Sequence, residues 1–181
     1  MQILEVYVAW VKGNPLLSAA IQFAILGTLG EVISNVVRTR RIEWPFGVLT
    51  TLLKMVAWAV LGVLIKYGFA GCKGAVAALL DHGLLPQQLG EGIGWAASVS
   101  VTANLFFGPQ MMAFHRLEDN LIDRKWDFTG IQKAWATLIW FWIPAHTVTF
   151  MMPPDYQIGL AAAWSLVLGL IMGLTNKVKK Q

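Results

Sequence analysis

The stretch NPLLSAAIQFAILGTLGEVISNVV, residues 14–37, decides the fold of this chain because it is long, apolar and interrupted by one acidic residue. A helix rises about 1.5 Å per residue, so roughly 22 residues cover the ~30 Å hydrocarbon core of a bilayer. Apolar side chains favour insertion by about 0.3–0.6 kcal/mol each, whereas a carboxylate near the centre costs on the order of 3 kcal/mol. The segment is therefore predicted to span a membrane and to need a polar or cationic partner for Glu31.

The composition extends this interpretation to the whole chain. Of its 181 residues, 56% are hydrophobic and only 13% are charged, and the mean hydropathy is +0.58. Soluble domains carry about 25% charged residues, so the composition indicates an all-α integral membrane protein. Cys72 is the only cysteine, which excludes an internal disulfide and leaves no metal-ligand spacing. The net charge of +4 is explained by basic residues at the ends of membrane segments, so no nucleic-acid partner is expected.

Apolar runs predict one domain, residues 1–181, as a compact bundle of about five transmembrane helices with short interfacial helices. The predicted spans cover residues 15–37, 46–69, 93–117, 130–152 and 156–174. Residues 1–12 are expected to form an interfacial helix or an extension of the first span. Residues 71–92 are expected to form a loop with an interfacial helical turn or two. The charged stretch HRLEDNLIDRKWD, residues 115–127, is interpreted as a solvated connection, and no internal repeat is recognised.

The basic residues predict the orientation of these spans. With the N-terminus outside, ten basic residues fall on the inner side and three on the outer side. The inner residues are Arg38, Arg40, Arg41, Arg116, Arg124, Lys125, Lys133, Lys177, Lys179 and Lys180, and the outer residues are Lys12, Lys66 and Lys73. This bias agrees with the positive-inside rule and predicts N-out and C-in in a bacterial plasma membrane. In a eukaryote the corresponding prediction is an organelle membrane.

Three stretches, in chain order, resemble the Mpv-seventeen and peroxisomal membrane protein family. They are NPLLSAAIQFAILGTLGEVIS (14–34), ASVSVTANLFFGPQMM (97–112) and KAWATLIWFWIPAHTVTFMMPP (133–154). Glu31 stands where the family usually has aspartate, Gln157 lies near the place of its arginine, and the Gly-Pro and His-Trp-Tyr elements of the second span are absent. The resemblance implies a small membrane protein associated with a pore for ions or small solutes.

Glu31 and Lys54 are the candidate functional pair. In an antiparallel hairpin, Glu31 and Lys54 would lie about 10 and 13 Å from the same membrane face. We expect them to pair directly or through Asn35, or to line a polar cavity. An intramembrane charge suggests a functional site, but a static ion pair that fixes helix register explains the same residues.

Further polar candidates lie in the third and fourth spans. Asn104, Gln110 and His115 could line a polar pathway or form hydrogen bonds between helices. Pro109 and Pro144 should interrupt their helices, since each proline frees a backbone carbonyl. His146 could titrate near neutral pH and gate a pore, or serve only as a hydrogen-bonding residue.

Three functions remain open from the sequence. The first is a narrow channel for ions or small metabolites, and the second is a non-conducting structural or partner-binding membrane protein. A small secondary transporter is the third. No catalytic motif, cofactor or metal site is recognised, so an enzyme is not expected. The last span has small residues at four-residue spacing, namely Gly159 with Ala163 and Gly169 with Gly173. Such pairs allow another helix to pack closely, either within the chain or in a homo-oligomer.

Overall fold

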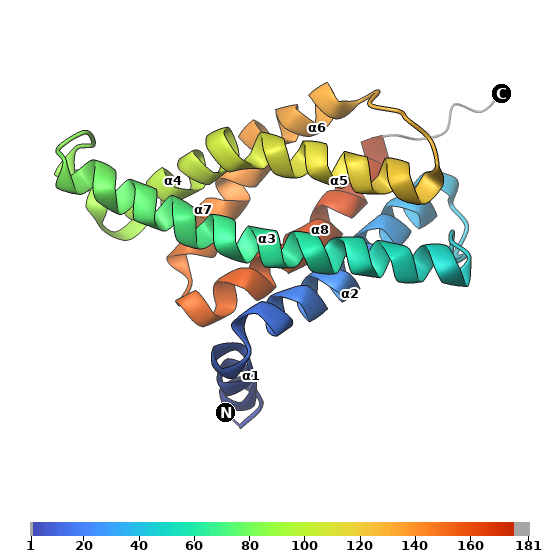
Figure 1. Cartoon of the computed structure of the whole chain (residues 1–181), viewed down its shortest axis with the longest axis horizontal. Coiled ribbons are helices and arrows are strands. Elements are labelled where there is room, and N and C mark those ends of the chain that lie inside the picture. The colour runs from blue at the N-terminus through green and yellow to red at the C-terminus, as the bar shows by residue number, and fades with distance from the viewer. Residues whose placement is uncertain (1, 176–181) are drawn as a thin grey trace.

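The computed structural model describes residues 2–175 of the chain, and these residues form helices and connecting segments without any strand (Figure 1). The helices, in chain order, are α1 (Gln2–Gly13), α2 (Pro15–Thr39), α3 (Val48–Asp81), η1 (Gln87–Gly90), α4 (Gly92–Thr102), η2 (Ala103–Phe107), α5 (Gly108–Asp123), α6 (Ile131–Thr137), η3 (Leu138–Trp142), α7 (Ile143–Met151) and α8 (Pro154–Thr175).

Helix α2 packs against α3 along one side and against α8 along another. Small residues allow both contacts. Gly27 of α2 leaves room for the indole ring of Trp58 on α3, since a Cβ atom there would overlap the ring. Gly169 of α8 faces the backbone of Gly30, and Gly173 faces Ser34 and Val37. The small residues of the last span therefore pack within the chain, against α2, which runs parallel to α8.

Two helices are interrupted by π-helical turns, and each turn ends just before a proline. The amide of Gly108 donates to the carbonyl of Ala103, and the amide of Ile143 donates to that of Leu138. Both hydrogen bonds reach back five residues rather than four, which is the π-helical register. A proline cannot donate a backbone hydrogen bond and its ring clashes with the preceding turn, so the extra residue relieves that clash. The expected interruptions at Pro109 and Pro144 therefore take the form of π turns.

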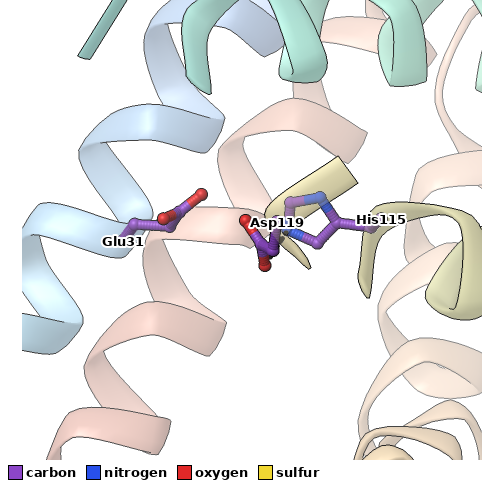
Figure 2. A group of neighbouring side chains, drawn as sticks. All are labelled: Glu31, His115 and Asp119. Carbon is purple, nitrogen blue, oxygen red and sulfur yellow. Dashed lines mark ion pairs between the residues drawn. The ribbon is translucent and has the colours of Figure 1, made fainter. Parts of the chain in front are cut away.

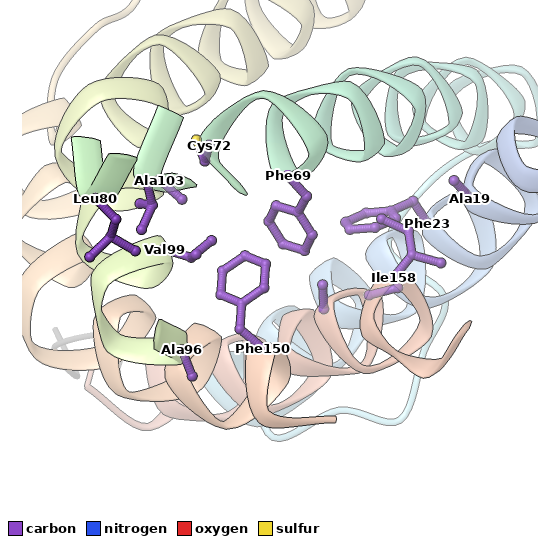
Figure 3. Packing of buried hydrophobic residues seen from close by; sticks show 13 residues of the cluster. Ala19, Phe23, Phe69, Cys72, Leu80, Ala96, Val99, Ala103, Phe150 and Ile158 are labelled. Carbon is purple, nitrogen blue, oxygen red and sulfur yellow. The ribbon is translucent and has the colours of Figure 1, made fainter. Parts of the chain in front are cut away.

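These two interrupted helices form an antiparallel pair. Helix α4 contacts α7, η2 contacts η3, and α5 contacts α6, so the two π turns meet side by side. This repeat-like arrangement was not recognised in the sequence. The buried core extends from this pair to α2, α3 and α8 and includes Phe69 and Phe150, whose ring centroids are 4.7 Å apart (Figure 3).

The outside of the bundle is apolar. Leu49 of α3 is 71% exposed and Val56 is 61% exposed, whereas Lys54 on the same helix is buried. By length and composition, α2, α3 and α8 could each cross a membrane. The segments predicted as the spans 93–117 and 130–152 fold as helices divided by π turns.

Several predicted boundaries are wrong. Residues 71–81 were expected to form a loop, but α3 continues through them to Asp81, since no proline interrupts this run, and only Gln87–Gly90 forms a separate helical turn. Helix α5 continues to Asp123 through much of the stretch interpreted as a solvated connection. Helix α1 is a separate helix, because Asn14 leaves the helical conformation before α2 begins. Lys177, Lys179 and Lys180, which were part of the orientation argument, lie outside the described residues.

The contact between α2 and α8 yields a stability prediction. We expect Gly169→Ala to lower the stability by about 1–3 kcal/mol, because a Cβ atom would overlap the carbonyl oxygen of Gly30. The measurement is thermal unfolding of the purified protein in detergent. Gly74→Ala on α3 is the matched control, since a Cβ atom there meets no other atom within 4 Å. A Gly169→Ala variant as stable as the Gly74→Ala variant would contradict the α2–α8 packing.

Candidate functional site

Lys54 lies between two carboxylates from different helices. Its Nζ atom is 2.6 Å from Oε2 of Glu31 on α2 and 2.9 Å from Oδ1 of Asp119 on α5. The Lys54 side chain is only 6% exposed, and its Nζ also lies 5.1 Å from the centre of the Phe46 ring. Removing an ammonium group from water costs several kcal/mol unless opposite charges and hydrogen bonds replace the water. The two carboxylates supply that replacement and join α2, α3 and α5.

Glu31 is held from a second direction. The indole Nε1 of Trp58, one turn after Lys54 on α3, donates a hydrogen bond to Oε1 of Glu31 at 2.7 Å. The two carboxylate oxygens of Glu31 are therefore both engaged, one by Lys54 and one by Trp58. The ion pair between Glu31 and Lys54 is direct, so the bridging role expected for Asn35 is not needed. Asn35 lies one turn further along α2, where its backbone carbonyl accepts a hydrogen bond from the Thr39 hydroxyl.

His115 and Glu118 complete what we call the ion cluster, namely Glu31, Lys54, His115, Glu118 and Asp119. Nε2 of His115 is 3.8 Å from Oδ2 of Asp119, and its Nδ1 is 3.8 Å from Oε2 of Glu118. These separations are too long for hydrogen bonds. Nδ1 of His115 and Oε2 of Glu118 are buried atoms without a hydrogen-bond partner among the described residues. The ring of His115 also packs on Trp58, with centroids 4.4 Å apart.

Part of the ion cluster has the composition of a metal site. Glu31, His115 and Asp119 each offer one ligand atom, and these atoms lie within 4.8 Å of one another (Figure 2). The ammonium of Lys54, however, already contacts both carboxylates and supplies the positive charge that a metal would bring. We therefore interpret this group as an ion-pair network.

A second polar group, the amide–imidazole cluster of Ser100, Asn104 and His146, lies beside the π turns. Asn104 Nδ2 donates to the carbonyl of Ser100 at 2.8 Å and contacts Nδ1 of His146 at 3.1 Å. Because an amide nitrogen only donates, Nδ1 of His146 is the acceptor and Nε2 carries the ring proton. The Ser100 hydroxyl donates to the carbonyl of Ile143 at 2.7 Å. Asn104 and His146 thus connect the two interrupted helices.

A partly open cavity of about 100 Å³ has members of both polar groups in its wall. His115 and Trp58 line it from the side of the ion cluster, while Asn104 and His146 line it from the side of the π turns. The remaining wall is mostly apolar, with Ser165 as a further polar residue. This volume accommodates a few water molecules or one small molecule. The cavity therefore joins two polar groups that are far apart in the sequence.

The structure separates the expected site residues into two sets. Glu31 with Lys54, and Asn104 with His146, are brought together in contact. Gln110 is exposed on the outside of α5 and does not line the cavity.

The sequence interpretation missed Asp119, Glu118 and Trp58. Their helical spacing was the available signal, since His115 and Asp119 lie four residues apart and share one face of a helix. That signal is only useful once α5 is known to continue past residue 117.

Comparison of the chain with protein-family models, with curated protein sequences and with solved structures found no match.

The geometry around Lys54 predicts that removing its charge lowers the stability of the protein more than removing the charge of one of its two carboxylate partners. We expect Lys54→Met to lower the stability by about 3–5 kcal/mol, because it leaves two carboxylates facing one another without the ammonium. Asp119→Asn should cost less, since Glu31 still pairs with Lys54. Chemical or thermal unfolding in detergent measures both.

Lys12→Met is the matched control for this test. Lys12 Nζ lies 3.4 Å from Oδ2 of Asp155, but its side chain is 63% exposed. An exposed ion pair of this kind contributes about 0–1 kcal/mol. If Lys54→Met were no more damaging than Lys12→Met, Lys54 would not hold the three helices together.

Proposed function

We propose that the chain crosses a membrane with five helical spans and conducts ions or small solutes along a narrow path inside one bundle. Three helices long and apolar enough to cross, together with the pair of interrupted helices, supply the five spans. The parallel course of α2 and α8 supports an odd number of spans, since the first and fifth spans must run in the same direction. Exposed leucine and valine side chains on α3 suit a lipid environment.

The observation that carries this proposal is the partly open cavity between the ion cluster and the amide–imidazole cluster. Ionisable and amide side chains inside a bundle of apolar helices are costly, and they mark pathways for ions and solutes in membrane proteins. The cavity is about 100 Å³, so only ions, water and very small molecules would pass.

A non-conducting structural role is the second candidate, and a specific observation favours it. Lys54 is balanced by two carboxylates, and the Asn104 amide nitrogen is hydrogen-bonded, as a purely packing role requires. This alternative does not account for the cavity.

The antiparallel pair of π turns favours a third candidate, a secondary transporter, because transporters bind substrate at interrupted helices in paired repeats.

The membrane context is also part of the proposal. Three exposed basic residues at the C-terminal end of α2 and just after it support the N-out and C-in orientation in a bacterial plasma membrane, or an organelle membrane in a eukaryote. They are Arg38, Arg40 and Arg41. Membership of the Mpv-seventeen and peroxisomal membrane protein family rests on the three sequence stretches and fits this context. Lipid is the expected partner, and association into a homo-oligomer is an additional prediction.

Reconstitution into lipid vesicles tests conduction. We expect vesicles with the protein to dissipate an imposed ion gradient faster than empty vesicles, as followed with a potential-sensitive dye. Ala103→Leu should reduce this flux to the level of empty vesicles, because Ala103 lines the cavity and a leucine would fill it.

Val101→Leu is the matched control for Ala103→Leu, since Val101 lies on the exposed face of the same interrupted helix. Both variants are compared at equal thermal stability and equal protein content per vesicle. Wild-type flux equal to that of empty vesicles for every ion and small solute would overturn the channel and favour the structural role. Accumulation of a solute against its gradient would favour the transporter.

A further inference from the structure

The cavity between the ion cluster and the amide–imidazole cluster is lined mainly by apolar groups. Aromatic side chains reach it from four elements, namely α2, α3, η2 and η3, and two methionines of α5 add their thioether chains. The aromatic residues are Phe23, Trp58, Phe69, Phe107 and Trp142, and the methionines are Met111 and Met112. Such a wall offers a polarisable apolar surface and little hydrogen bonding.

Most polar groups in this wall are already engaged by the protein itself. The Asn104 amide nitrogen contacts Ser100 and His146, and the Ser165 hydroxyl contacts two backbone carbonyls. Each ring nitrogen of His115 has a carboxylate of the ion cluster as its neighbour, 3.8 Å away. A molecule inside the cavity therefore meets apolar surface, and a charged molecule would lose its water without gaining a partner.

We infer that the cavity is a binding site for a small, neutral aromatic molecule about the size of one benzene ring. This inference goes beyond the proposed channel function, and binding does not require conduction. Inside a conducting bundle, the bound ring would displace the water of the cavity and obstruct the path, so such a molecule would act as a blocker.

The volume of the cavity sets the size of the ligand. In another protein, an apolar cavity of about 150 Å³ holds one benzene molecule. The present cavity is smaller, at about 100 Å³, but it is partly open. Met111 and Met112 lie in its wall, and the unbranched methionine side chain adapts its shape to irregular spaces. A single ring is therefore expected to fit after small side-chain shifts, whereas two fused rings are expected to be excluded.

The aromatic side chains of the wall favour an aromatic ligand over an aliphatic one of equal size. Aromatic rings in edge-to-face or offset arrangements are stabilised beyond the burial of their area. The wall already contains such a contact, since the Phe69 ring meets the His146 ring edge-on with centroids 5.3 Å apart. The sulfur atoms of the two methionines also gain from an aromatic neighbour.

Fluorine NMR with fluorobenzene tests the inference on the full chain in detergent. We expect a saturable change in the fluorobenzene resonance that corresponds to about one site per chain, after subtraction of the signal from protein-free micelles. Fluorocyclohexane is the matched aliphatic probe, since it carries a six-membered ring without π electrons. It should bind about fivefold more weakly, because it cannot make the aromatic contacts.

Ala103→Leu should abolish the saturable signal, because the added side chain occupies the cavity, whereas Val101→Leu on the exposed face should keep it. Leu138→Ala provides a test by gain of binding. Leu138 lines the cavity and is 4% exposed, so its truncation enlarges the space. This variant should bind 1-fluoronaphthalene, which the wild-type cavity excludes, and an unfolded variant would not gain such a site.

Wild-type protein without a saturable fluorobenzene signal would overturn the inference, whether the cavity stays closed or an alkyl chain of the detergent occupies it. Equal affinities for fluorobenzene and fluorocyclohexane would overturn the aromatic assignment, and so would a folded Ala103→Leu variant that binds as wild type does. Vesicles that do not conduct would reject the channel and leave the binding site standing. Conducting vesicles without fluorobenzene binding would do the reverse.

Discussion

The burial of the Lys54 ammonium is the constraint on which the rest of the arrangement depends. An ammonium group inside a bundle of apolar helices is tolerated only where opposite charges surround it, and the two carboxylates come from α2 and α5. Helices α2, α3 and α5 must therefore meet at this group. Trp58 reinforces this meeting by donating to Glu31 while its ring fills the space left by Gly27. The ion cluster thus sets the register between α3 and its two neighbours.

The two prolines impose the second constraint. Pro109 and Pro144 each force a π turn, and the two π turns lie side by side in the antiparallel pair. Asn104, within the first π turn, reaches His146 just after the second. The cavity is lined by residues of both turns, among them Phe107 of the first and Leu138 of the second. The proline positions and the ion cluster together therefore define a polar interior bounded by apolar helices.

The sequence predicted the helical class and the Glu31–Lys54 contact, because matching depths in an antiparallel hairpin follow from helix geometry alone. It did not predict the continuation of α5 to Asp123, since charged residues such as those in 115–127 are usually solvated. Asp119 was missed for that reason. Gln110 was a candidate lining or hydrogen-bonding residue but is exposed on α5. The π turn that begins at Ala103 changes the angle between Asn104 and Gln110 about the helix axis, and such a turn is not readable from hydropathy.

An experimental structure in lipid nanodiscs, at a resolution that shows ordered water, is the most direct test of a hydrated polar path inside one bundle. The account predicts the Lys54 ammonium between the Glu31 and Asp119 carboxylates, with water in the cavity between His115 and His146 at the depth of the membrane interior. A dry cavity closed by apolar side chains, with Lys54 facing solvent or lipid headgroups, would contradict it.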